Sequence, residues 1–436
     1  MKIMNGLMIF LACVFVGQCY GQTGTADPNA PAQDSADGDF KNIWTRPKLT
    51  GDWYGLRSDL TDRGITFDLR LSQFYQAVTS GGANTNAAYG GKLDYILKLD
   101  GQKLGLWEGL FVTVHTETQF GNNISADAGD LALPNTAMLW PVPGYRGTAV
   151  TGFLVEQALS ENFALLGGKI NVLDLWTMVY PHTGAGQEGF MNTNMIASAL
   201  PWFRWVNLSV MGGGALFLTD DGQVQGGVVA FDSQNSSTTS GFDDMFEEGT
   251  CVVGLWRFFF EVGGKPGSLL FAGGTSTRNY DSLDESDWGF APGVGLTNDE
   301  KNGAWTTAFY YDQVFWQAPD NAKKNMRFFT GWSLSDGDPS FGRWGGFGSV
   351  EAWGLIQDRA KDRMGVGAFY NQLSSDLKNT TSDLGLEGRN MWGGELYYNA
   401  EITPSLHVTP NLQLVSNATD GDSTAVILGV RAVMDF

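Results

Sequence analysis

The chain has 436 residues, of which 43% are hydrophobic and only 17% are charged, with 58 glycines and 15 tryptophans. This length allows two or three ordinary domains or one large barrel, and abundant glycine and aromatic residues with few charges are more typical of strands than of helices. The formal net charge of −20 argues against nucleic-acid binding, because such proteins carry basic patches that replace counterions.

Residues 1–21 are predicted to be a secretory signal peptide, because Lys2 precedes an apolar run over residues 3–16 that small residues follow. The run is shorter than the roughly 20 residues that a membrane-spanning helix needs, which disfavours an anchor. Lipid attachment at Cys19 is disfavoured by the large residue before it. Cleavage leaves Cys251 as the only cysteine, so no internal disulfide is expected.

Two short features precede the strands. Residues 22–48 are rich in Asp, Ala, Pro and Gln, and we expect a disordered acidic, Pro-rich segment there. One short helix is predicted next, because Asp52 can cap it, apolar residues recur at helical spacing, and Gly64 stops it. Residues 49–436 are expected to form a single folded domain.

From Ile65 onward, apolar and polar side chains alternate with the two-residue period of strands. The clearest run is the last, over residues 426–436, where Arg431 and Asp435 belong to the polar set. The run before it carries Pro410 on its apolar side, where proline is expected to interrupt strand pairing. No stretch after the leader approaches 18 consecutive apolar residues, so a mature chain in a membrane must cross it as a closed barrel.

The connections between these runs alternate in length. The turn at 403–405 is brief, whereas 417–423 is longer and polar, which matches the periplasmic turns and outer loops of outer-membrane barrels. About 390 residues at about 24 per strand and connection give roughly 16 strands, enough to leave an aqueous channel. The predicted fold is all-β: a transmembrane antiparallel β-barrel of about 16 strands with one short N-terminal helix.

A soluble β-sandwich would show the same alternation. Sandwiches rarely combine it with so many aromatic residues at strand ends, and here we expect these to form girdles at the membrane interfaces. The expected girdle residues are Trp202, Phe203, Trp205, Trp256, Phe258, Phe260, Tyr310, Tyr311, Tyr397 and Tyr398.

Charged residues of the early runs fall consistently on one side of the alternation, which predicts a polar lumen. The candidate lumen-lining residues are Arg70, Lys92, Asp94, His115, Glu117, Glu156 and Lys169. The alternative for each is a charge pair that stiffens the wall without touching solute.

Catalytic and metal-binding patterns are missing. The three histidines are scattered and the mature chain has one cysteine, so we expect no metal site of the zinc type and no cofactor. There is no phosphate loop, no GxSxG elbow and no HExxH motif. The residual enzyme hypothesis is a pair of carboxylates for glycoside cleavage, drawn from Glu117, Glu156, Glu351 and Glu395.

Acidic stretches at 243–248 and 281–287 are expected in outer loops, where calcium binding is the alternative to simple solvation.

Several blocks resemble the carbohydrate-selective porins of the OprB family, over essentially all of residues 49–436. They include LTGDWYGLRSDLTDRGITFDL, YGGKLDYILKLDGQKLGLWEG, VHTETQFG, GFLVEQALSENFALLGGKINVLD, GWSLSDGDPS and the ending from ELYYNAEITPSLHVTP to Phe436. The resemblance implies a 16-stranded barrel narrowed by inward loops, through which monosaccharides and small oligosaccharides diffuse passively. It also implies that Lys92, Asp94, His115 and Glu117 lie near the constriction; family members often carry Arg where this chain has Lys92.

We therefore expect a sugar-selective pore, not an enzyme, in the outer membrane of a Gram-negative-type bacterium. Its expected partners are small neutral sugars and outer-membrane lipids, with no nucleic acid, and the barrel is either a homotrimer or a monomer. Two alternatives stay open: a general porin that prefers cations, suggested by the acidic excess, and a sugar-binding surface barrel or glycosidase.

Overall fold

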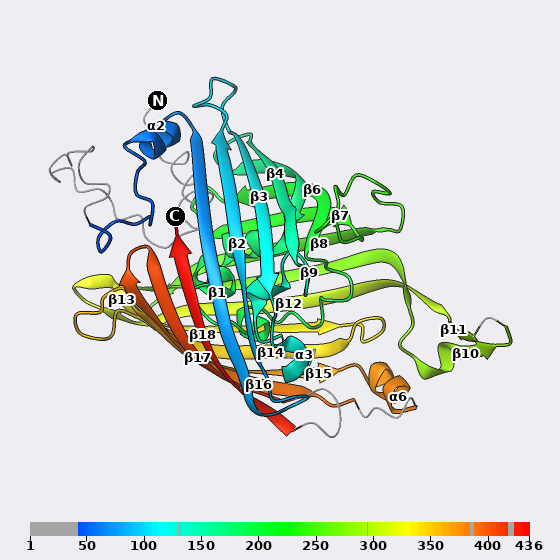
Figure 1. The fold of residues 1–436 in the computed structure, drawn as a ribbon. Coiled ribbons are helices and arrows are strands. Elements are labelled where there is room, and N and C mark those ends of the chain that lie inside the picture. Colours follow the sequence, from blue (N-terminus) through cyan, green and yellow to red (C-terminus); the bar gives the residue numbers. More distant parts are fainter. Residues whose placement is uncertain (1–41, 130, 132, 294, 384–387, 417–422) are drawn as a thin grey trace.

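The computed structural model describes residues 42–436 except 130, 132, 294, 384–387 and 417–422. The predicted signal peptide and residues 22–41 of the predicted N-terminal segment lie outside the described residues. Sixteen antiparallel strands form a closed barrel, in which the first strand pairs with the last (Figure 1). The predicted barrel of about 16 strands is confirmed.

The barrel strands are β1 (Ile65–Gly82), β2 (Ala87–Asp100), β3 (Leu110–Gly121), β4 (Gly147–Ala158), β5 (Phe163–Asn171), β6 (Ser209–Leu218), β7 (Val224–Asp232), β8 (Thr250–Val262), β9 (Lys265–Asp281), β12 (Glu300–Ala318), β13 (Asn321–Ser335), β14 (Gly342–Trp353), β15 (Arg363–Leu373), β16 (Met391–Thr403), β17 (Leu406–Val415) and β18 (Ser423–Asp435). A separate hairpin of β10 (Trp288–Ala291) and β11 (Gly295–Asn298) projects beyond the barrel wall (Figure 1). The helices are α2 (Leu56–Asp62), α3 (Ser125–Ala128), η2 (Thr136–Leu139), α4 (Val172–Val179), η3 (Pro181–Gly186), α5 (Thr193–Ile196), η4 (Glu285–Asp287) and α6 (Ser375–Asp383).

The predicted N-terminal helix is present as α2, next to the start of β1 (Figure 1). The Asp52 carboxylate accepts hydrogen bonds from the Ser58 amide at 2.9 Å and from its hydroxyl at 2.8 Å, which ties the preceding turn to the helix. Gly64 has a φ of +92°, and a side chain there would approach the Asp100 carbonyl to 2.8 Å, so glycine is required at the turn into β1. Among the described residues, no helix is both long and apolar enough to cross a bilayer.

The two faces of each strand meet different surroundings, as the alternation predicts. On β18 the side chains of Leu428 and Val430 are exposed on the outer face, whereas Arg431 is completely buried on the inner face. On β2, Lys92 and Asp94 are only 2% and 3% exposed and face inward. The apolar set therefore faces outward and the charged set faces the lumen.

Pro410 lies within β17 rather than ending it. It is opposite Val430 of β18, but the ladder to β16 passes from the pair Tyr397 and Asn411 directly to the pair Ala400 and Val408. Because proline has no N–H to donate, the interruption is limited to one side of one strand.

The aromatic residues divide between the two faces, which partly corrects the girdle prediction. Trp256 and Phe258 are 43% and 41% exposed on the outer face, as expected. Trp205 lies in the connection between β5 and β6 and is fully buried. Tyr310 and Tyr397 point inward and are 3% and 1% exposed. Only the outward-facing aromatics can contribute to a girdle.

The connections are mostly long at one end of the barrel and mostly short at the other, as predicted; the exceptions include residues 83–86 at the long end and residues 101–109 and 354–362 at the short end. The acidic stretches at 243–248 and 281–287 both lie on the long side, consistent with outer loops.

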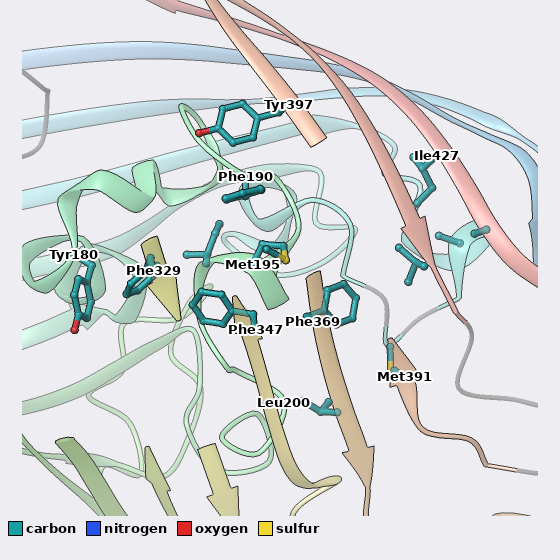
Figure 2. Packing of buried hydrophobic residues seen from close by; sticks show 14 of the residues in the cluster. Tyr180, Phe190, Met195, Leu200, Phe329, Phe347, Phe369, Met391, Tyr397 and Ile427 are labelled. Atoms are coloured by element: carbon teal, nitrogen blue, oxygen red, sulfur yellow. The ribbon is translucent and has the colours of Figure 1, made fainter. Parts of the chain in front are cut away.

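Residues 172–208 connect β5 to β6 and carry α4, η3 and α5; we call them the constriction loop. This loop folds into the barrel, where its Phe190 and Met195 pack among Phe347, Phe369 and Tyr397 of the wall (Figure 2). The rings of Phe190 and Tyr397 have centroids 4.9 Å apart. Much of the lumen is thus filled with side chains, and the open space is divided into cavities on either side of the loop.

Candidate functional site

A cavity of about 70 Å³ lies between the early strands and the constriction loop. We call it the polar cavity; its lining residues are Arg70, Lys92, Asp94, Ile96, His115, Glu117, Asn171, Leu173, Asp174, Thr177, Pro181, Gly184, Ala185, Gln187 and Glu188. Strands β1 to β3 supply the charged wall, and α4 and η3 supply the opposite side. Five of the seven predicted lumen residues meet there.

Lys92 is the centre of the charged wall. Its ammonium donates to Glu117 Oε1 at 2.5 Å and to Asp94 Oδ1 at 2.9 Å, and all three side chains are at most 4% exposed. Asp94 and Glu117 are register partners on β2 and β3, so the strand pairing itself brings the two carboxylates together. The lysine neutralises their repulsion, and loss of one member of such a buried group costs about 3–5 kcal/mol.

His115 connects this wall to the constriction loop. Its Nε2 lies 3.0 Å from Asp94 Oδ1, and its Nδ1 lies 2.7 Å from Asp174 Oδ2 on α4. The start of α4 is fixed because the Asn171 side chain accepts hydrogen bonds from the amides of Leu173 and Asp174. A protonated imidazole donates to both carboxylates, whereas a neutral one donates to only one.

Arg70 makes a second connection between wall and loop. Its guanidinium donates to both carboxylate oxygens of Asp435, at 2.7 and 3.0 Å, and to Glu188 Oε1 of the loop at 2.9 Å. Next to it, the Gln187 amide donates to Asp94 Oδ2 at 2.7 Å. The loop residues that border the polar cavity are therefore held from β1, β2 and β3.

Glu156 and Lys169 do not line the polar cavity. Glu156 faces inward, and its Oε1 is buried without a hydrogen-bond partner among the described residues. Ile170 and its register partner Val210 line the lumen, so the adjacent pair of Lys169 and Met211 faces outward. The Lys169 ammonium donates to a carbonyl of the connection between β7 and β8 at 2.6 Å. This placement differs from the expectation for Lys169.

Sequence reasoning missed most of the residues that hold the constriction loop from the far wall. Three inward arginines donate to main-chain carbonyls of the loop: Arg257 to Val179, Arg363 to His182, and Arg431 to Gly186 at 2.8 Å and Gly189 at 3.0 Å. The alternation already puts Arg431 on the inner face. No local pattern indicates that the two carbonyls bound by Arg431 lie more than 200 residues away in the chain.

Two of the carboxylates considered for catalysis, Glu395 and Glu351, have partners in the wall and the loop. Glu395 accepts the amides of Met191 and Asn192 at 2.8 and 2.9 Å. Glu351 is paired with Arg363 and accepts a hydrogen bond from Tyr397. Both carboxylates thus have positioning roles in the wall and loop.

His182 of η3 lies in the loop against the rings of Tyr180 and Phe329, with centroids 5.8 and 4.8 Å away. Burial and the positive charges of Arg327, Arg363 and Arg257 hold the pKa of His182 well below its usual range. The histidine is therefore neutral in the folded protein at neutral pH.

The ligand atoms of Asp94, His115 and Glu117 all lie within 4.8 Å of one another, a spacing that could hold a metal ion. The ammonium of Lys92 already bonds to two of these three groups. Because a cation would have to displace this lysine, the donor set does not fit a resident metal.

A closed antiparallel barrel with a loop folded into its lumen and a charged cavity beside that loop defines a porin. The model of the family described as carbohydrate-selective porin, OprB family, matches residues 84–436. The chain belongs to this family. It is an outer-membrane sugar-selective porin, and its family and fold are those of a channel.

Solved structures agree on the fold. The high-pH structure of Pseudomonas putida OprB is 18% identical, with a TM-score of 0.77 over 91% of this chain and 100% of that chain. The low-pH structure of the same protein is 16% identical, with a TM-score of 0.53 over 90% and 99% of the two chains. A search of curated proteins gives no match.

Proposed function

We propose that monosaccharides and small oligosaccharides diffuse passively along the polar cavity, between the β1–β3 wall and α4. The observation that carries this proposal is the mixed lining of the cavity. Carboxylate, amide and cationic groups can match sugar hydroxyls, while Ile96, Leu173 and Pro181 offer apolar surface to the C–H faces of the ring.

The charged groups divide into two roles under this proposal. Lys92, Asp94 and Glu117 are buried and bonded to one another, which suits a stiff and correctly shaped wall. Asp174 and Glu188 of the constriction loop have side chains that are 37% and 32% exposed. We infer that these two loop carboxylates contact the solute, and that the paired wall residues position them.

A weak preference for cations accompanies this function. The polar cavity is lined by four carboxylates but only two permanent cations, Arg70 and Lys92. Carboxylates in a narrow aqueous passage attract cations and repel anions. We propose this preference as a property of the sugar pore, not as a replacement for it.

We infer that the exposed apolar residues of the outer face contact outer-membrane lipids, and that residues 1–21 direct secretion. The oligomeric state is either a monomer or a homotrimer. Chemical crosslinking of the protein in membranes, read by the mass of the product, distinguishes the two.

Single-channel recording with added glucose tests the proposed pathway. Purified protein in a planar bilayer should show steps of modest conductance that glucose reduces reversibly and saturably. The variants Asp174→Asn and Glu188→Gln should weaken the block by glucose. Glu247→Gln, at an exposed position in the outer loop between β7 and β8, is the matched control and should leave the block unchanged.

Three outcomes contradict the proposal in different ways. Large steps that glucose does not reduce indicate a general porin. Absence of conductance in the bilayer, together with binding of sugar in solution, indicates a closed barrel that binds sugar at the cell surface. Release of reducing sugar from oligosaccharides by the purified protein would support the hypothesis that the protein is a glycosidase.

A further inference from the structure

A second, larger cavity of about 250 Å³ lies on the other side of α4, against the inner faces of β6 to β9. We call it the apolar chamber, and its wall includes Trp140, Trp176, Trp202, Val229, Leu255 and Tyr310. Along β7 it extends from Gln225 to Phe231, so it follows the wall for most of that strand. Nearly all of its surface is carbon.

Helix α4 separates this chamber from the polar cavity. Asp174 and Thr177 line the polar cavity, whereas Leu175, Trp176 and Met178 line the chamber. Only Leu173 borders both spaces. The amphipathic helix thus divides the lumen into a charged passage and an apolar one.

The lining determines what the chamber can hold. A cavity of about 150 Å³ lined by aliphatic and aromatic side chains stays dry and binds benzene, and this chamber is larger. A free sugar does not fit it, because several hydroxyls would lose water without gaining partners. A charged solute is disfavoured more strongly for the same reason.

One side of the chamber is a rigid aromatic surface. The Trp176 ring is held firmly, with centroids 5.1 Å from Tyr180 and 4.9 Å from Tyr310. Trp140 is fixed as well, because its N–H donates to the Leu208 carbonyl at 3.3 Å. Rigid rings favour stacked or edge-to-face contact with another aromatic ring.

We propose that the apolar chamber is a second binding site, for a neutral one-ring aromatic molecule. The ring lies among the aromatic and aliphatic side chains of α4 and β6 to β9. Because this site does not share the charged groups of the polar cavity, it is separate from the sugar pathway.

Tryptophan fluorescence tests the proposal with 4-nitrobenzyl alcohol, a neutral aromatic alcohol that quenches indole emission. The full-length mature protein in detergent should show a saturable quenching component, which excess benzyl alcohol reverses. Val229→Phe fills the chamber and should abolish this component. Val228→Phe adds the same ring on the outer face of the same strand, where Val228 is 42% exposed, and should keep it.

Calorimetry measures the affinity for benzyl alcohol without relying on tryptophan emission. Linear quenching in the wild type, or a saturable component that survives Val229→Phe in a folded barrel, would overturn the chamber site. Glucose uptake into proteoliposomes reports on the polar pathway separately, so the two proposals fail independently.

Discussion

Replacing Lys92 by methionine is the most direct test of how the polar cavity works. The substitution keeps the length of the side chain but removes the ammonium that bonds to Asp94 at 2.9 Å and to Glu117 at 2.5 Å. His115, whose Nε2 lies 3.0 Å from Asp94 and 3.9 Å from Glu117, then remains beside the two buried carboxylates on β2 and β3. Lys92→Met should therefore change both stability and ion selectivity.

The magnitude follows from the charges. The lining of the polar cavity carries four carboxylates and the two permanent cations Arg70 and Lys92, so Lys92→Met makes its net charge one unit more negative. A unit charge about 6 Å from a permeating ion in water contributes roughly 0.7 kcal/mol, which is about a threefold change in its concentration. Potassium rises and chloride falls by this factor, so we expect the ratio of potassium to chloride permeability to rise about tenfold. The loss of the buried partner should also destabilise the barrel by about 3–5 kcal/mol.

Reversal potentials across a bilayer with a potassium chloride gradient measure the selectivity. The effect should be clear in dilute salt and fade near 1 M, because the Debye length falls to about 3 Å. Lys323→Met, at an exposed position near the start of β13, is the matched control and should leave selectivity unchanged. Lys92→Arg keeps the charge and should behave as the wild type in selectivity.

The temperature at which the barrel unfolds, measured from the change in its electrophoretic mobility, reports on stability in the same samples. If folded Lys92→Met channels kept the wild-type reversal potential in dilute salt, ions would not pass the polar cavity. The assignment of the solute pathway would then be refuted.

Three further predictions concern the loop and the wall. Glu395→Gln leaves a weaker acceptor for the amides of Met191 and Asn192, and hydrogen bonds to a charged group contribute about 1.5–3 kcal/mol each. Hydrogen exchange of these two amides, measured by mass spectrometry, should therefore become faster. Unchanged exchange would contradict the role of Glu395 in anchoring the loop. The lowered pKa of His182 keeps it neutral in the fold, so stability should be lost as pH falls below the unfolded value of about 6.5 and the unfolded state takes up the proton. His182→Phe should remove that part of the pH dependence in thermal unfolding, and identical slopes in the two proteins would count against it. Pro410→Val restores one N–H on the β16 side of β17 and should stabilise the barrel by about 0.5–1.5 kcal/mol. A clear loss of stability would mean that the proline conformation itself is needed.

The sequence was sufficient for the barrel and for much of the charged wall, because both follow from a local period of two. Alternation placed Arg70, Lys92 and Asp94 on one face, and pairing of neighbouring strands then brought them together. It failed at Lys169, where the preceding residues Ala164 to Gly168 are all apolar or glycine and give no contrast between the faces.

The anchors of the constriction loop could not be predicted, because they join residues far apart in the chain. Arg431 binds the Gly186 carbonyl 245 positions earlier, and Glu395 binds the Met191 amide 204 positions earlier. Likewise, Trp205 belongs to an aromatic group that looks like a membrane girdle in the sequence. Only the inward path of the loop explains why it is buried.

The attachment of one loop to β1, β2, β8, β15, β16 and β18 has a mechanical consequence. An empty cylinder of strands flattens easily into an ellipse, whereas a cylinder with an internal spoke fixed at opposite sides keeps its cross-section. The bore of this barrel should therefore depend little on bilayer thickness or lateral tension. Shortening the loop to admit larger molecules would soften the wall and expose its arginines at the same time, so an engineered wider barrel needs those residues replaced together with the loop.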